Sequence, residues 1–240
     1  MILRFALLFF AMIAPGFAVD AEALLAKGNQ CFADGKFADA KIAYEQLLAD
    51  GPRASVLTNL GNAHFRLDEP GFAALAYERA LALEPGFADA QANLKFVREK
   101  SGARIVESLF WEAPALRLRT SLVFHIAEAC IALSILAALW GSTRRERRSW
   151  LWAAVGVQFL IVSLGGTIWL AAKRQAEFAI VTSTTAEART EPADRAGLAE
   201  ALTPGSRVRV RGVHGAWTHC LLPGGAEGWV PTGAVERIVQ

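Results

Sequence analysis

The chain has 240 residues, of which 53% are hydrophobic and 20% are charged, and its mean hydropathy is +0.29. Soluble domains usually carry about 25% charged residues, so this composition predicts membrane-embedded segments. The 25 basic and 23 acidic side chains leave a net charge of +2, which is too balanced for a protein that binds nucleic acid through a basic face. The length leaves room for one or two modest domains and not for a large enzyme fold.

The N-terminal segment is typical of a secretory signal peptide. One positive charge, at Arg4, precedes an apolar run that ends at Ala14. The small residues Gly16 and Ala18 predict cleavage after Ala18, so that residues 1–18 form the signal. An uncleaved anchor is the alternative interpretation.

Residues 19–100 contain an internal repeat of 33 residues, in which four positions recur: Gly28 as Gly61, Ala40 as Ala73, Tyr44 as Tyr77 and Pro52 as Pro85. Small residues at such places let two antiparallel helices approach closely, and the proline ends the second helix of each unit. The pattern resembles the tetratricopeptide repeat, here as two copies followed by a closing helix. The resemblance implies an all-α solenoid whose exposed face is covered by that last helix.

The resemblance also implies a module that binds an extended peptide or a helix of a partner protein. The predicted groove residues are four asparagines, which are distributed over the first helices of the two repeats and the closing helix: Asn29, Asn59, Asn62 and Asn93. The subfamily that clamps a C-terminal carboxylate needs three basic residues, and Leu25, Asp89 and Asn93 stand in their places. The sequence therefore argues against that clamp. An ordinary polar lining of the groove remains the alternative role of the asparagines.

Two long apolar segments follow the repeats. Residues 121–141 and 150–172 are each long enough, as a helix, to cross about 30 Å of hydrocarbon. The loop 142–149 carries four arginines, which predicts a cytoplasmic position. Residues 101–120 mix apolar side chains with arginine and are predicted to be an interfacial connector. The sequence thus predicts a membrane protein with two transmembrane helices and with both terminal domains on the side of the membrane away from the cytoplasm.

Two ionisable residues lie within the first predicted span. Glu128 is about 10 Å below its outer end, and His125 is one helical turn away. Ionisable groups inside a membrane suggest function, here a proton-sensitive or partner-binding site. A hydrogen bond from Glu128 to small polar residues of the second span is the structural alternative, and we favour it.

The last segment, residues 173–240, has the pattern of a small β domain. Valine and arginine alternate at 207–211, which places Val208 and Val210 on one face of a strand and the arginines in water. The sequence from Pro204 onward, with Gly-Trp-Val-Pro at 228–231, resembles the bacterial SH3 domain and implies an SH3-like barrel. By this resemblance, Trp217 and Pro231 occupy peptide-binding positions.

No catalytic or metal-binding motif is recognised. His219 and Cys220 are neighbours on a predicted strand and point to opposite faces, so they cannot act as base and nucleophile. Three widely spaced cysteines are interpreted as packing residues: Cys31, Cys130 and Cys220. There is no metal-ligand cluster and no Walker or dinucleotide glycine motif. The sequence therefore predicts no cofactor, no metal and no enzymatic activity.

The order of these parts resembles the BatE-like proteins of the bacterial aerotolerance operon. In that family the neighbouring genes encode a MoxR-type ATPase and membrane proteins with von Willebrand A domains. The resemblance implies a multi-domain protein of the bacterial inner membrane, with two spans and with both terminal domains in the periplasm. It also implies that the protein serves as an anchored interaction scaffold of the cell envelope, in an aerotolerance or stress complex. An envelope sensor whose SH3-like domain binds peptidoglycan is the alternative.

Overall fold

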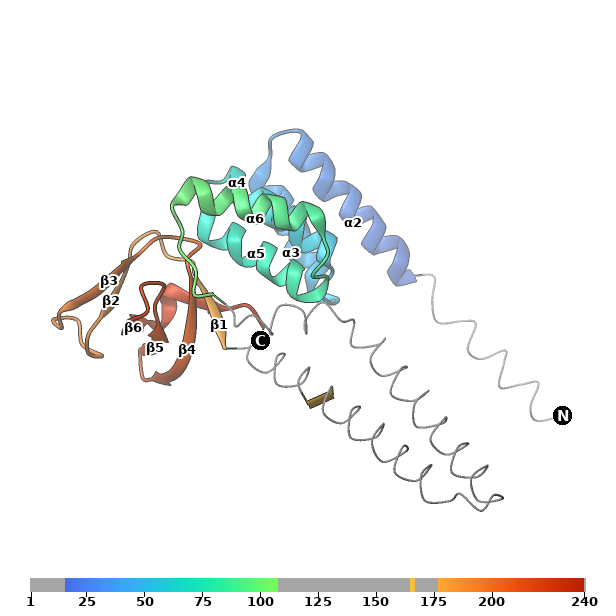
Figure 1. The fold of residues 1–240 in the computed structure, drawn as a ribbon. Coiled ribbons are helices and arrows are strands. Elements are labelled where there is room, and N and C mark those ends of the chain that lie inside the picture. The colour runs from blue at the N-terminus through green and yellow to red at the C-terminus, as the bar shows by residue number, and fades with distance from the viewer. Residues whose placement is uncertain (1–15, 108–164, 167–176, 240) are drawn as a thin grey trace, which may run out of the picture. The chain divides into compact units, whose positions relative to one another are not determined.

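The computed structural model of the chain describes residues 16–107, 165–166 and 177–239. The chain divides into two units, one made of Met1–Val106 with Phe178–Gln240 and the other of Glu107–Glu177. In the first unit the described residues form five helices followed by a seven-stranded antiparallel sheet (Figure 1).

The helical part consists of two hairpins and a fifth helix. Helix α2 pairs with α3, α4 pairs with α5, and α6 lies against α5. The bounds of the helices are α2 Gly16–Ala33, α3 Phe37–Ala49, α4 Ala54–Arg66, α5 Pro70–Leu83 and α6 Ala88–Ser101. Pro70 begins α5, where its missing N–H leaves no helical bond unmade, and Gly102 ends α6 in the left-handed region at φ 65°.

The 33-residue repeat corresponds to one close contact that occurs in both hairpins. A Cβ atom added to Gly28 would lie 2.7 Å from the ring of Tyr44, and one added to Gly61 would lie 2.5 Å from the ring of Tyr77. Both tyrosines are almost completely buried. Glycine is therefore required at these two positions, because the tyrosine ring fills the space that a side chain would need.

The strands form one antiparallel sheet in the order β3-β2-β6-β5-β4-β1-β7. Their bounds are β1 Phe178–Val181, β2 Ala186–Arg189, β3 Leu198–Leu202, β4 Arg207–His214, β5 Trp217–Leu221, β6 Glu227–Pro231 and β7 Val235–Arg237, with the short helix η1 Thr232–Ala234 before β7. Val208 and Val210 of β4 are buried. The prediction that the neighbouring arginines lie in water is wrong for Arg209, which is 8% exposed and lies over the ring of Phe178 at 4.6 Å.

One of the hydrophobic clusters joins the helices to the sheet. A single cluster contains Tyr77 and Leu94 from the helices together with Phe178 and Ile180 from β1. Gly71 of α5 is so close to the end of β1 that an added Cβ would lie 2.7 Å from the backbone of Thr182. The helical part and strand β1 are thus packed directly against each other.

Arg79 of α5 ties the helices to the last strand. Its guanidinium donates to the Glu236 carboxylate at 2.7 Å and to the carbonyl oxygens of Arg237 and Ile238 at 3.0 and 3.3 Å. Three hydrogen bonds from one side chain hold the chain end near β7 against α5.

The predicted fold class is wrong. We expected a tetratricopeptide solenoid, a transmembrane hairpin and a small SH3-like barrel, whereas the described residues form five helices and a seven-stranded antiparallel sheet with a common core. The physical reason is that α5 packs against β1. A solenoid unit would instead bury that surface against a further repeat.

No helix in residues 16–107, 165–166 and 177–239 is both long and apolar enough to cross a membrane. The longest of them, α2, has 18 residues and carries Asp20, Glu22 and Lys27, whereas a span needs about 20 predominantly apolar residues. The described residues therefore do not support the prediction of a two-span inner-membrane protein with periplasmic domains, and that prediction is corrected to this extent.

Several predictions fall on residues that the structure does not describe. These are residues 1–15 of the predicted signal peptide, the predicted spans 121–141 and 150–172 apart from Gly165 and Gly166, the loop 142–149, most of the connector 101–120, and the side chains of His125, Glu128 and Cys130.

Candidate functional site

The four predicted groove asparagines come together as two hydrogen-bonded pairs. Asn59 of α4 donates from Nδ2 to Oδ1 of Asn29 on α2, at 3.3 Å. Asn93 of α6 donates in the same way to Oδ1 of Asn62 on α4, at 2.9 Å. Each pair therefore connects two successive first helices, and the second pair repeats the first.

A tyrosine fixes the orientation of each pair. The hydroxyl of Tyr44 donates to Oδ1 of Asn29 at 2.9 Å, and that of Tyr77 donates to Oδ1 of Asn62 at 2.7 Å. Burial raises the pKa of both tyrosines, so both hydroxyls stay protonated donors at neutral pH. An oxygen that accepts two hydrogen bonds fixes which end of the amide group points outward.

The pairing leaves one donor and one acceptor open in each pair. Nδ2 of Asn29 and Oδ1 of Asn59 form no hydrogen bond within the described residues, and the same holds for Nδ2 of Asn62 and Oδ1 of Asn93. All four side chains are exposed or half-buried. A hollow of about 150 Å³ lies at the first pair, lined by Asn29, Phe32, Tyr44, Asn59 and Asn62.

An aromatic row, formed by Phe32, Phe65 and Phe96, accompanies the asparagines. Each phenylalanine follows an asparagine by three residues on α2, α4 and α6, so it lies on the same side of its helix. The rings of Phe65 and Phe96 meet edge to face at 5.6 Å, and Phe96 is 56% exposed. The motif Asn-x-x-Phe is visible in the sequence, although its phenylalanines were not among the predicted binding residues.

The two predicted binding residues of the sheet also lie together. Trp217 of β5 and Pro231 of β6 are directly opposite in the strand register. They line a hollow of about 330 Å³ with the charged side chains of Glu187, Arg189 and Asp194. The resemblance to SH3 domains was the basis for assigning a peptide to this place. The SH3-like barrel is corrected above, and the binding of a peptide by Trp217 and Pro231 stays a prediction.

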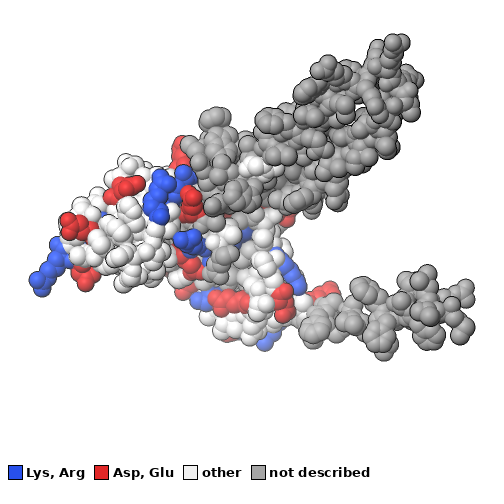
Figure 2. All heavy atoms as spheres, turned by 90° about the horizontal axis from the view of Figure 1, so that it is seen from below, with Lys and Arg blue, Asp and Glu red and all other residues white. Residues whose placement is uncertain are grey.

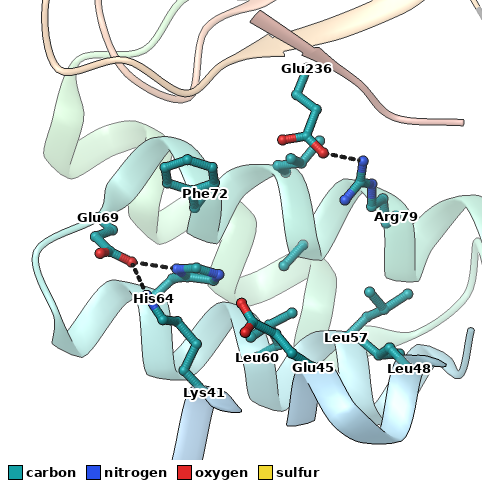
Figure 3. Close-up of a pocket in the computed structure, with 12 residues that line it drawn as sticks. Lys41, Glu45, Leu48, Leu57, Leu60, His64, Glu69, Phe72, Arg79 and Glu236 are labelled. Carbon is teal, nitrogen blue, oxygen red and sulfur yellow. Dashed lines mark hydrogen bonds and ion pairs between the residues drawn. The ribbon is translucent and has the colours of Figure 1, made fainter. Parts of the chain in front are cut away.

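A larger hollow, which was not predicted from the sequence, lies on α3, α4 and α5 (Figure 3). Its volume is about 410 Å³. It is lined by Lys41, Glu45, Leu48, Leu57, Leu60, His64, Glu69, Phe72, Leu75, Ala76, Arg79 and Glu236. Leucines thus form an apolar floor, with charged side chains at the edges.

His64 is held rigidly at this hollow. Its Nδ1 lies 2.6 Å from Oε2 of Glu69, and the same oxygen accepts a hydrogen bond from Lys41 Nζ at 3.4 Å. The ring stacks on Phe72 with 5.4 Å between centroids, and His64 is 7% exposed.

Burial lowers the pKa of His64 despite the Glu69 hydrogen bond. Burial alone would raise the pKa of Glu69, but the hydrogen bond from His64 and the charge of Lys41 outweigh it and lower that pKa. At neutral pH the pair is therefore a neutral imidazole beside an ionised carboxylate.

The two described cysteines, Cys31 and Cys220, are at least partly buried and are not disulfide-bonded. Cys220 is fully buried, and burial raises its pKa to about 12, which leaves an unreactive thiol. Cys31 is half-buried and, like Cys220, forms no disulfide. His219 lies 3.5 Å from Glu227. In the described part of the chain, no group of three His, Cys, Asp or Glu side chains could hold a metal ion.

The surface charge of the described residues is mixed. Comparison with known proteins assigns the chain to no family. Figure 2 shows basic and acidic side chains side by side on the described part of the face that it draws. No protein-family model and no curated protein matches the chain. The BatE-like identity therefore stays a prediction.

Proposed function

We propose that this protein is an interaction scaffold whose helical part binds an extended peptide segment of a partner protein. The segment would lie along the asparagine row, which consists of Asn29, Asn59, Asn62 and Asn93. The observation that carries the proposal is the open donor and the open acceptor in each asparagine pair. An extended backbone presents N–H and C=O groups alternately and needs a partner for each when water is removed. Two amide pairs in the same arrangement meet that need at two places along one segment.

The tyrosine contacts support this proposal energetically. Ordering an amide side chain on binding costs free energy. Here Tyr44 and Tyr77 already hold Asn29 and Asn62 in place, so part of that cost falls on folding. Binding to such a preorganised row is stronger than binding to free amides.

The aromatic row supports a peptide over a small polar ligand. Phe65 is half-buried and Phe96 is 56% exposed, and aromatic side chains are enriched in protein interfaces. Side chains of a bound segment would pack on these rings while its backbone bonds to the asparagines. By the BatE-like resemblance, proteins with von Willebrand A domains are the first partners to test.

A peptide selection tests the proposal. Random peptides displayed on phage are selected on the purified full-length chain, and the dissociation constant of an enriched peptide is measured with Asn59→Ala and Asn93→Ala variants. Each variant loses an open acceptor, so we expect affinity to fall by roughly two- to tenfold. Gln46→Ala is the matched control, because Gln46 is exposed on α3 and belongs to neither pair. Equal affinity of the parent and both asparagine variants would contradict the proposal.

A further inference from the structure

The hollow at His64 has one open charge and one open lone pair. Because Glu69 accepts a hydrogen bond from Nδ1, the neutral ring carries its proton there, and Nε2 keeps a lone pair. In Figure 3 that second nitrogen faces away from Glu69, toward the Glu45 carboxylate. Nε2 forms no hydrogen bond within the described residues, although the His64 side chain is more than nine-tenths buried.

Glu45 supplies the open charge. It lines the hollow and forms no ion pair with any described residue, while the two cations of the hollow are already engaged. Lys41 bonds to Glu69, and Arg79 bonds to Glu236. The open groups are therefore a hydrogen-bond acceptor and an anion, and one positively charged donor group suits both.

The second hairpin shows what satisfies the corresponding carboxylate. Glu78 lies 33 residues after Glu45, at the same position of the repeat. It is 7% exposed and forms ion pairs with Arg98 and Arg207. In the first hairpin no cation of the described residues takes that place.

We propose that the hollow between α3, α4 and α5 is a second binding site, which takes a lysine side chain of a partner protein. The ammonium group would donate to Nε2 of His64 and to the carboxylate of Glu45, while the four-carbon stem lies on Leu57 and Leu60. A compact ammonium with three donors suits two acceptors that approach from different directions, whereas a guanidinium fork suits one carboxylate in a plane. The stem requires an apolar floor, and these leucines form it.

This site goes beyond the proposed peptide-binding row. The two hollows have no lining residue in common. Loss of one site therefore need not impair the other, and the two proposals can fail separately.

An NMR titration of the purified full-length chain tests the site. The first probe is Nα-acetyl-lysine methylamide, whose side-chain ammonium group is free. The second is its norleucine counterpart, which lacks the ammonium group, and the third is free butylammonium. The readout is the imidazole resonance of His64, assigned by its absence in a His64→Gln variant. We expect the lysine probe and butylammonium, which carries the same four-carbon stem and ammonium group, to shift this resonance saturably, and the norleucine probe to bind at least tenfold more weakly.

A pair of glutamate variants locates the contact. Glu45→Gln removes a charge-assisted hydrogen bond, so the lysine probe should bind at least about tenfold more weakly. Glu84→Gln is the control, because Glu84 is exposed at the end of α5 and does not line the hollow; its affinity should equal that of the parent. A norleucine probe that binds as well as lysine, or a Glu45→Gln variant with parental affinity, would overturn the proposal. Butylammonium that binds at least tenfold more weakly than the lysine probe would overturn the assignment of the contact to the stem and the ammonium group.

Discussion

The two helical hairpins carry the same repeat in different surroundings. Tyr44 and Tyr77 are buried in the same way, and each holds an asparagine. The corresponding glutamates differ, because Glu78 is enclosed by two arginines in the core region shared with the sheet, whereas Glu45 lines an open hollow. The repeat therefore determines how each hairpin packs internally, and the neighbouring elements determine which repeat positions are left to bind a ligand.

The largest expected effect separates these two glutamates. Glu78→Ala leaves Arg98 and Arg207 partly buried without their carboxylate, and breaking a buried pair costs about 3 kcal/mol or more. Glu45→Ala should change the free energy of unfolding by less than about 0.5 kcal/mol, as is usual at exposed positions. Urea denaturation of both variants measures the difference. Equal destabilisation would show that the two positions do not differ as described.

The next effect tests the internal packing that the hairpins have in common. Ala40 and Ala73 are both fully buried, so replacement of either by leucine should cost roughly 1–3 kcal/mol. Ala73 belongs to the core that includes Phe178, and Ala40 belongs to a cluster of helical residues only. Hydrogen exchange of the β1 amides should therefore accelerate more in Ala73→Leu. If Ala40→Leu accelerates it equally, the two cores are not separate.

A pH titration tests the open hollow of the first hairpin. The pKa of His64 is below its ordinary 6.5 because burial disfavours the charged ring. Between the folded-state pKa and about 6.5 the unfolded chain binds more protons, so stability falls as the pH falls through this window. The lowered pKa of Glu69 adds a further loss of stability at more acidic pH, below 4.5. Lys41, Glu45 and Glu69 are the charged groups that face the ring.

The His64→Gln variant isolates the contribution of the imidazole. Its denaturation midpoint should change less between pH 7.5 and 5.5 than that of the parent, because no ring remains to be protonated on unfolding. His214→Gln is the control, since His214 is exposed on β4. A parental pH dependence in His64→Gln would assign the effect to other groups.

The contacts within one repeat could be predicted from the sequence, and those between distant segments could not. Gly28 and Tyr44 recur as Gly61 and Tyr77 because they form a local contact, and this spacing is visible in the sequence. The bond from Arg79 to the carbonyl of Ile238 spans 159 residues, and nothing near Arg79 indicates it. For the same reason Arg209 was expected in water, although Phe178 of another strand covers it.

The same distinction between contacts within the repeat and contacts between separate elements applies to the candidate sites. The asparagines could be located because they recur at the repeat spacing, and their pairing follows from the alignment of the first helices. The hollow at His64 escaped detection because Glu45, His64 and Phe72 come from three helices and none of them forms a known motif. The only sequence signal was Glu69, five residues after His64 and followed by the proline that begins α5.

The smallest expected effect compares the two tyrosine hydroxyls. Tyr44→Phe and Tyr77→Phe each remove one hydrogen bond to an asparagine, which costs about 1 kcal/mol when the acceptor stays buried. Asn29 is exposed and Asn62 is half-buried, so water replaces the lost donor more readily at Asn29. Tyr77→Phe should therefore lower the free energy of unfolding more than Tyr44→Phe, by several tenths of a kcal/mol in urea denaturation. Both variants should weaken binding of a selected peptide, because each frees an amide that the tyrosine had held. A larger loss of stability in Tyr44→Phe would mean that exposure of the acceptor does not decide the cost.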